Sequence, residues 1–406
     1  MAAEPDYNSK QWRATFYTMW FGCFMTGFGF SMTMPFLSLF TGSLGNFNRF
    51  ELNLYSGIAF AITYLAQAVI SPYWGSLADR KGRKLMCLRA SGVMTVTILL
   101  TGLVSNVWLV ILLRLVQGLF SGYINNATAL MAGETKKSES GVVMTNMMTA
   151  SVSGSLLGPL FGGVLANYFG YRIPFIVTGV IMAIVFIATW FKADEHFTPI
   201  PAKNIKHGAD FWHSLGDTKL IWVLLLTTLV VETALMSVGP IISLFVAELM
   251  HGHGDISLVS GIVAAMPGFG AILVARKIGH KMDTIGAGKI LFGGLILATL
   301  FFIPMYFVTN PWTLALWRLL LGMASAAMLP AVQTALTVSV PREVFGRIFS
   351  FNQSAQAIGG VVGPMLGALI SGIFSYQEIF AVTAVLLLIN LVVLFCMRSH
   401  LVSLRK

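Results

Sequence analysis

Apolar residues along this 406-residue chain form twelve long runs that are separated by short polar segments. The runs cover residues 14–40, 53–74, 85–104, 107–132, 143–166, 171–192, 219–248, 257–278, 289–308, 312–337, 346–371 and 376–397. A helix of about 20 apolar residues crosses the ~30 Å hydrocarbon core of a bilayer. The pattern therefore predicts an all-α integral membrane protein with twelve transmembrane helices.

The two halves of the chain repeat each other. Arg114 and Arg318 each lie inside an apolar run, and they are 204 residues apart. The same spacing separates Gly75 from Gly279, Asp79 from Asp283, Gly82 from Gly286 and Gly118 from Gly322. Repeats in the same orientation build two bundles related by an axis along the membrane normal. We expect an N-terminal six-helix bundle at 1–192, a cytoplasmic linker at 193–218 and a C-terminal six-helix bundle at 219–406.

Composition and charge support a membrane protein and argue against nucleic-acid binding. Only 10% of the residues are charged, whereas soluble proteins carry about 25%. When the loops alternate between sides, Arg49 and Arg172 lie on one side and Arg114 and Arg318 inside the membrane, while the other 22 of 26 Lys and Arg residues share the opposite side. An excess of Lys and Arg marks cytoplasmic loops, so both termini are expected in the cytoplasm. The net charge of +10 is then a sign of topology.

The sequence contains no pattern typical of an enzyme. Cys23, Cys87 and Cys396 fall in three different apolar runs and lack the spacing of a disulfide or a metal site. There is also no phosphate-binding loop and no nucleophile–base spacing. We expect no cofactor, no metal and no enzymatic activity, and a non-transporting receptor is the rival hypothesis from another class.

A polar motif follows the second apolar run and reads Gly75-Ser-Leu-Ala-Asp79-Arg80-Lys81-Gly82-Arg83-Lys84. Glycines permit a tight turn between two helices. Asp79 can accept hydrogen bonds from amides at a helix N-terminus, and Arg83 can pair with Glu134 at the end of the fourth run. This predicts a cytoplasmic gate, with a solvated loop as the alternative. A degenerate copy carries Gly279, Asp283 and Gly286.

This motif resembles motif A of the major facilitator superfamily. Residues 113–118 are similar to its motif B, and residues 154–163 resemble motif C of the twelve-helix drug:proton antiporters. Residues 34–37, 329–334 and 346–354 are similar to those of MdtG-type bacterial multidrug efflux proteins. The resemblance implies a transporter in the lipid of the bacterial inner membrane that exports small amphipathic or cationic substrates in exchange for protons. We expect it to function as a monomer, since both halves of the cavity come from one chain. A dedicated exporter of one metabolite, such as a siderophore or sugar, is the alternative.

The motif C-like segment has a physical signature of its own, which consists of Gly154, Gly158, Gly162, Gly163 and Pro159. Small residues one turn apart let two helix backbones approach closely. Proline removes a backbone hydrogen bond and weakens the helix locally. We expect this helix to form a moving seal between the two halves, and static close packing is the alternative.

Three charged residues deep inside apolar runs, Glu232, Arg114 and Arg318, are candidates for a functional role. Glu232 is the only carboxylate well inside one, and apolar surroundings favour the neutral acid that a proton carrier needs. Its alternative roles are attraction of cationic substrates and a buried hydrogen bond. The resemblance to motif B implies a part in proton transfer for Arg114, while a structural bond to carbonyls of neighbouring helices is the alternative. For Arg318 the structural role is favoured.

A polyspecific pocket needs apolar, deformable walls with a few polar groups. The resemblance places the first, fourth, seventh and tenth helices around such a pocket, completed by the second, fifth, eighth and eleventh. The candidate pocket residues on these helices are Met34, Phe36, Tyr123, Asn126, Met236, Gln333, Asn352 and Gln356. Ordinary helix packing is the alternative role for each of them.

Overall fold

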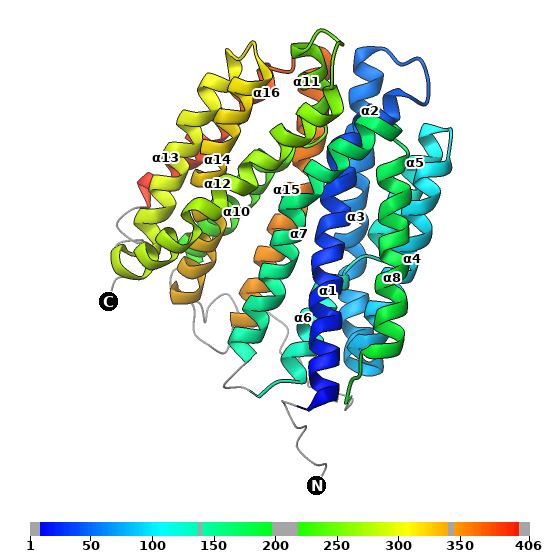
Figure 1. The fold of residues 1–406 in the computed structure, drawn as a ribbon. Coiled ribbons are helices and arrows are strands. Elements are labelled where there is room, and N and C mark those ends of the chain that lie inside the picture. Colours follow the sequence, from blue (N-terminus) through cyan, green and yellow to red (C-terminus); the bar gives the residue numbers. More distant parts are fainter. Residues whose placement is uncertain (1–8, 137–139, 197–217, 340–344, 398–406) are drawn as a thin grey trace. The chain divides into compact units, whose positions relative to one another are not determined.

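The computed structural model describes residues 9–136, 140–196, 218–339 and 345–397, except for the side chains of residues 79, 140, 141, 276, 279, 280, 283 and 345–347. Within these ranges every regular element is a helix (Figure 1). Twelve helical segments are long and apolar enough to cross a membrane, as the hydropathy pattern predicts.

The first six segments run from α1 to α8. The first comprises α1 (Lys10–Thr33), the short 3₁₀ helix η1 (Met34–Phe36) and α2 (Leu37–Gly42), and the fourth comprises α5 (Val107–Leu119) and α6 (Tyr123–Gly133). The others are α3 (Arg49–Lys81), α4 (Arg83–Leu103), α7 (Ser140–Phe169) and α8 (Ile173–Lys192).

The last six segments begin with α10 (Thr218–Ser237), which is followed by the shorter α11 (Ile242–Leu249). The others are α12 (Ile256–Ile285), α13 (Ala287–Tyr306), α14 (Pro311–Ser339), α15 (Phe345–Ile373) and α16 (Glu378–Cys396).

Two helices extend well beyond the apolar runs that predict them. α3 continues to Lys81, so Gly75 lies inside the helix and takes no part in a turn. The turn depends on Gly82 alone, whose φ of 93° favours glycine because a side chain is strained there. Gly286 repeats this geometry between α12 and α13 with a φ of 98°. The expected tight turn is confirmed at Gly82, and the role expected for Gly75 is wrong.

Three of the transmembrane segments are broken near a proline or glycine. Pro35 lies in η1, Gly122 precedes α6 with a φ of 111°, and Pro240 lies between α10 and α11. Proline cannot donate a backbone hydrogen bond, and glycine adopts positive φ at low cost. In contrast α14, which repeats α5 and α6, is a single helix despite Pro330.

By their contacts the residues fall into two units, one of residues 1–46 with 66–202 and the other of residues 47–65 with 203–406. The beginning of α3, up to Leu65, thus belongs to the second unit. The Nε of Arg49 donates to the carbonyl of Ser371 at 3.0 Å, and the hydroxyl of Ser371 donates to Asn53 at 3.0 Å. The division of the chain into two six-helix bundles stays a prediction.

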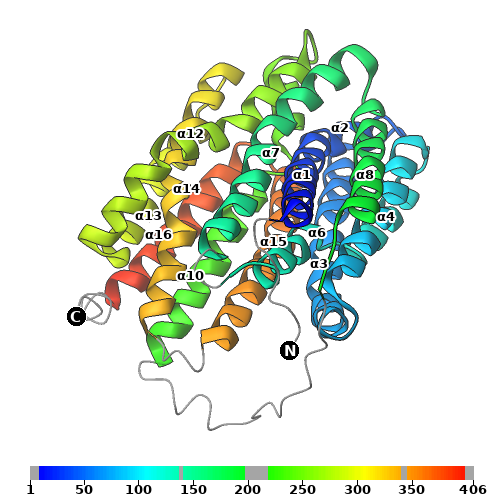
Figure 2. The ribbon, with the colours of Figure 1, turned by 60° about the horizontal axis from the view of Figure 1, so that its bottom comes forward.

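Close contact between α1 and α7 depends on glycine in the first unit (Figure 2). A Cβ atom added to Gly154 would overlap the carbonyl oxygen of Phe24, and one added to Gly162 would overlap that of Met32. Gly158 is as close to Ser31 and to the backbone of Phe28. This glycine face therefore packs closely on α1 of its own unit, as the alternative of static close packing expects. The moving seal between the two halves stays a prediction.

The second unit repeats this contact. On α15, a Cβ at Gly367 would overlap the carbonyl oxygen of Ser237, and one at Gly363 would lie 2.7 Å from that of Thr233. The pair α12 and α14 is equally close, because a Cβ at Gly322 would overlap the backbone of Pro267. Small residues thus fix the helix spacing in both units.

Candidate functional site: intramembrane charges and the inner-end cluster

Glu232 lies in the interior of α10 and is half-buried. Its Cβ and Cγ pack against Gly359 of α15, where an added Cβ would lie 2.7 Å from the Cβ of Glu232. Among the residues that the structure describes, the carboxylate forms no hydrogen bond or ion pair. An acid in this setting can change its protonation state without breaking a bond to a neighbour.

Three other polar side chains of α10 form hydrogen bonds to neighbouring helices. Thr228 donates to the amide oxygen of Asn352 at 2.7 Å, and Thr227 donates to that of Asn390 at 3.2 Å. Ser237 and Thr383 share a hydrogen bond of 3.3 Å. These pairs hold α10 to α15 and α16, as expected for buried polar groups. They distinguish Glu232 from Thr227, Thr228 and Ser237, whereas the buried hydroxyl of Thr233 has no partner among the described residues.

Arg318 of α14 faces a cavity of about 280 Å³ within the second unit. The cavity walls are Leu235, Val238, Pro267, Gly268, Phe302, Leu321 and Ser325. The Nε of Arg318 donates to the carbonyl oxygen of Val263 at 3.0 Å. This is the bond to a neighbouring helix that the structural role predicts.

Arg114, the counterpart of Arg318 in the first half, is only 2% exposed. One of its terminal nitrogens donates to the side-chain oxygen of Gln117 at 3.0 Å. Both residues belong to α5, so this bond spans a single turn of one helix. The proposed role of Arg114 in proton transfer stays a prediction.

Side chains of α3 and α4 satisfy the backbone where the fourth transmembrane segment is broken. Trp74 donates to the carbonyl of Leu119 at 2.6 Å, and Arg89 donates to that of Ser121 at 2.9 Å. The guanidinium of Arg89 also lies 3.8 Å from the centre of the Trp74 ring. Carbonyls freed by a helix break need such donors inside a membrane. These hydrogen bonds stabilise the helix break. The sequence analysis did not identify Trp74 or Arg89 as residues with this role.

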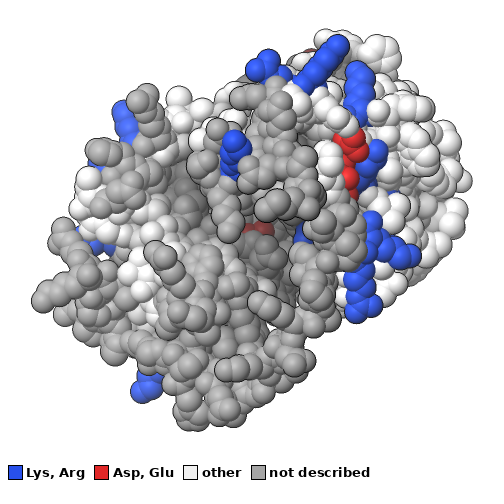
Figure 3. All heavy atoms as spheres, turned by 90° about the horizontal axis from the view of Figure 1, so that it is seen from below, with Lys and Arg blue, Asp and Glu red and all other residues white. Residues whose placement is uncertain are grey.

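A polar cluster lies at the end of the first unit where α1 begins and α8 ends, the end seen in Figure 3. Glu134 accepts hydrogen bonds from the backbone N–H and the Nδ1 of His196, at 2.6 and 3.0 Å. The hydrogen bond to Glu134, together with its negative charge, raises the pKa of His196 above the ordinary value. Glu195 accepts from the amides of Arg83 and Lys84, at 2.7 and 2.8 Å.

The cluster joins four helix ends of the first unit. Glu195 binds the N-terminal amides of α4, which is where a helix favours negative charge. Trp12 of α1 donates to the carbonyl of Glu134, the C-cap of α6, at 3.0 Å. Asp194 pairs with Gln11 and donates its backbone N–H to Thr15 at 3.0 Å. The segment after α8 therefore fixes the neighbouring ends of α1, α4 and α6.

The gate prediction receives a partly different set of partners. Glu134 was expected to pair with Arg83, and the structure gives it His196 as a partner. The side chains of Asp79 and Asp283 lie outside what the structure describes, as does most of the linker. Arg80 is an exposed residue near the end of α3. The gate itself stays a prediction.

The predicted pocket residues divide into two groups. Phe36, Tyr123 and Asn352 are at most 1% exposed, and Tyr123 shares a hydrogen bond of 2.9 Å with Thr189. The half-buried residues are Met34, Asn126, Met236, Gln333 and Gln356. In this conformation the first group serves helix packing. The pocket that these eight residues were predicted to form stays a prediction.

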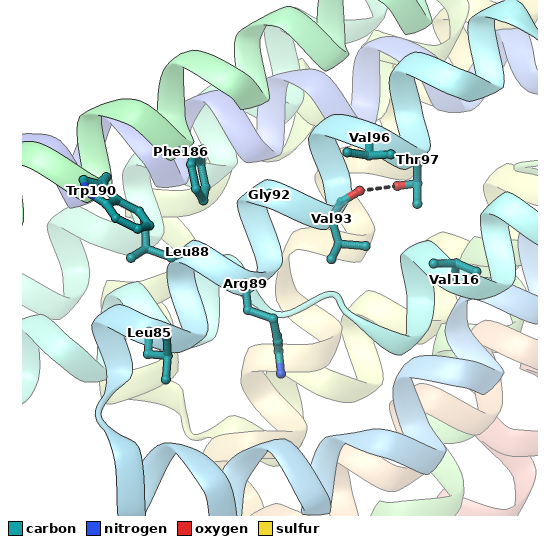
Figure 4. Close-up of a pocket in the computed structure, with 10 residues that line it drawn as sticks. All are labelled: Leu85, Leu88, Arg89, Gly92, Val93, Val96, Thr97, Val116, Phe186 and Trp190. Carbon is teal, nitrogen blue, oxygen red and sulfur yellow. Dashed lines mark hydrogen bonds between the residues drawn. The ribbon is translucent and has the colours of Figure 1, made fainter.

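A cavity of about 570 Å³ in the first unit is lined by residues of α4, α5 and α8 (Figure 4). Its lining residues are Leu85, Leu88, Arg89, Gly92, Val93, Val96, Thr97, Val116, Phe186 and Trp190. Several of these side chains are exposed on the helix surface, as expected of a groove facing lipid. None of the predicted pocket residues lines it. Within the described part of the chain, no group of three or more His, Cys, Asp or Glu residues could hold a metal ion.

Comparison with known proteins decides the family. The model of the Major Facilitator Superfamily matches residues 19–281 and 224–404. The chain belongs to the Major Facilitator Superfamily. It is 43% identical over 386 residues to the multidrug resistance protein MdtG of Salmonella arizonae, and 44% identical over 386 residues to MdtG of Salmonella paratyphi C. Each alignment covers 95% of this chain and 96% of the relative, so the resemblance noted from the motifs is confirmed.

Solved structures share the fold at low identity. A bacterial homologue of the human lysosomal transporter Spinster, in an inward-facing and unoccupied conformation, has a TM-score of 0.75 at 14% identity and covers 98% of this chain and 99% of its own. A mutant of the nucleoside transporter NupG has a TM-score of 0.78 at 11% identity, over 94% of this chain and 99% of its own. The chain is a member of a transporter superfamily, and its matched relatives are not enzymes.

Proposed function

We propose that this protein exports chemically varied amphipathic or cationic compounds across the bacterial inner membrane, in exchange for protons and by alternating access. The identity of 43–44% to multidrug resistance proteins, over 95% of this chain, supports this substrate class. The duplicated helices support two bundles that open alternately to each side. We also propose that the protein works as a monomer in membrane lipid, with both termini in the cytoplasm.

One observation supports proton coupling most directly, and it is the setting of Glu232. The residue lies in α10, one of the broken transmembrane segments, and no described residue holds its carboxylate. A ligand shifts a two-state transporter only if it binds the two states with different affinity. A proton bound by Glu232 in one state and released in the other meets this requirement. A cationic substrate would compete for the same carboxylate.

The test is uptake of a lipophilic cationic dye into inside-out vesicles with an acidic interior. The wild-type protein is expected to accumulate dye only while the pH gradient lasts. Glu232→Gln keeps the shape of the side chain and removes the ionisable group, so gradient-driven accumulation should fall to background.

The matched control is Glu51→Gln, since Glu51 lies at the start of α3 and accepts a hydrogen bond from the backbone of Asn48 that glutamine can also accept. This control should transport like the wild type. Undiminished transport by Glu232→Gln would place the proton site on another residue. No dye movement by the wild type would favour an exporter of a single metabolite.

A further inference from the structure

A half-buried arginine, Arg318, faces a cavity in the second unit, and no described acid neutralises it. The cavity of about 280 Å³ is lined by residues of α10, α12, α13 and α14 and by Val238, which follows α10. Its polar wall is formed by Arg318 and Ser325, and its apolar wall by leucine, valine, proline and phenylalanine. Arg318 is in the interior of α14, at least a full turn from either helix end. A charge at this depth is costly and is rarely without a function.

Part of the guanidinium group has a structural task. Pro267 in α12 has no N–H, so the carbonyl of Val263, one turn earlier, lacks its helical donor. The Nε of Arg318 donates to this carbonyl at 3.0 Å. Gly322, one helical turn after Arg318, makes this hydrogen bond possible. Because it has no side chain, α14 can pack directly against the backbone of Pro267. The arginine thus replaces the donor that proline removes.

The two terminal nitrogens of Arg318 remain available to a ligand. Among the described residues they form no hydrogen bond and no ion pair. Glu232 is one turn from Leu235, a wall residue, yet does not pair with Arg318. Asp283 is 20 residues beyond Val263, which is ~30 Å along a helix. The guanidinium therefore presents its fork to the cavity without a counter-ion from these acids.

We propose that this cavity binds the oxyanion group of an amphipathic organic acid, a carboxylate or a phosphate, with Arg318 as the residue that binds it. The planar fork of a guanidinium matches both oxyanions with two parallel hydrogen bonds. A cavity of about 150 Å³ already admits benzene, so 280 Å³ accommodates an aromatic acid. The inference rests on the proposed export function and extends it, since the exported compounds then include acids.

The first test is thermal unfolding of the purified, full-length protein in detergent with three probes of similar shape. Benzoate carries a carboxylate, phenyl phosphate carries a phosphate, and benzamide is neutral. At about ten times its dissociation constant, a bound anion should raise the melting temperature by about 1–3 °C. A rise with benzoate alone indicates carboxylic acids, and a rise with phenyl phosphate alone indicates phosphate monoesters. No rise beyond that with benzamide overturns the proposal.

A pair of substitutions separates the structural task of Arg318 from ligand binding. Arg318→Gln should lower the melting temperature without ligand, because the carbonyl of Val263 loses its donor. Adding Pro267→Ala supplies a backbone N–H to that carbonyl and should restore the melting temperature. The double variant is then folded but lacks the positive charge, so its response to benzoate and phenyl phosphate should disappear. Arg318→Lys keeps the charge and should retain part of the response.

The proposal would also be overturned if the Arg318→Gln/Pro267→Ala double variant responded to the anions like the wild type. The dye assay keeps this test separate from the export function. A wild-type protein that binds benzoate but moves no dye would contradict multidrug export and leave the anion site standing. A wild-type protein that moves dye but shows no rise in melting temperature with the anions would contradict the anion site and leave the export function standing.

Discussion

Arg114 and Arg318 occupy the same place in the two halves of the chain, 204 residues apart, yet they have different surroundings. Arg114 is 2% exposed and bonds to Gln117, one turn away on its own helix. Arg318 bonds to Val263 on another helix and faces a cavity. A shared position in a duplicated fold therefore does not imply a shared role.

Two sequence differences account for the change. Leu321 stands where the first half has Gln117, so Arg318 lacks a partner on its own helix. Pro267 stands where the first half has Thr63, so α12 offers a carbonyl without a helical donor. The arginine of the second half thus turns to a neighbouring helix, which leaves the rest of its guanidinium in a cavity.

The two units also differ in where their acids lie. Glu232 is in the interior of α10 in the second unit, and the position 204 residues earlier is Phe28. In the first unit the acids with recorded partners near α4 and α6 are Glu134 and Glu195, at the helix ends. Under the two proposals above, ligand and proton binding belong to the second unit, whereas Glu134 and Glu195 anchor helix ends in the first.

The largest effect that the comparison predicts is on stability. Arg114→Ala removes a buried side chain and leaves Gln117 without its donor, so the free energy of unfolding should fall by about 2–4 kcal/mol. Arg318→Ala extends an existing cavity and should lower it by only about 1–2 kcal/mol. Unfolding of both variants in detergent measures the difference. Equal losses would mean that the two arginines have the same structural weight.

A smaller loss is expected from Gly322→Ala, which tests how Arg318 is positioned. The new Cβ would overlap the backbone of Pro267, and backbone cannot move aside as a side chain can. The free energy of unfolding should fall by about 1–3 kcal/mol, together with the stabilisation by benzoate or phenyl phosphate. Gly293→Ala in α13 is the control, because nothing lies within 4 Å of its added Cβ. A stable Gly322→Ala protein that keeps the anion response would contradict this packing.

The smallest effect concerns His196, whose partner Glu134 has Val338 as its counterpart in the second half. Folding raises the pKa of His196, so the pair adds stability below the unfolded pKa of about 6.5 and loses it as pH rises through the folded value. His196→Gln removes only the charge. Because the side chain is largely exposed, it should cost less than about 1 kcal/mol at pH 5.5 and nothing above pH 8. Melting curves at both pH values measure this, and a pH-independent cost would exclude a role for the charge.

The twelve helices were predictable because hydrocarbon requires long apolar runs, and the turn at Gly82 because a turn with positive φ favours glycine. The partner of each helix face was not. Inside a membrane the lipid-facing and packed faces are both apolar, so hydropathy gives no sign that Phe36 and Tyr123 are buried. For the same reason the sequence did not show that the glycine face of α7 packs on α1.

Contacts distant in sequence were also out of reach, as in the pairing of Glu134 with His196 across 62 residues. The contact of Arg318 did leave a signal. A proline inside a transmembrane helix frees the carbonyl four residues earlier, so Pro267 marks Val263 as an acceptor in need of a donor. The contacts of Trp74 and Arg89 were harder to predict. Both side chains donate to carbonyls at the break between α5 and α6, and the hydropathy pattern did not reveal that break.

Proton release on substrate binding tests the central claim most directly. The purified protein in weakly buffered detergent solution is mixed with the lipophilic cationic dye, and a pH indicator records the protons released. The wild type and Glu51→Gln are expected to release protons as the dye binds. Glu232→Gln is expected to release no protons, whether or not it still binds the dye. Release by Glu232→Gln equal to that of the wild type would contradict the assignment of the coupling proton to Glu232.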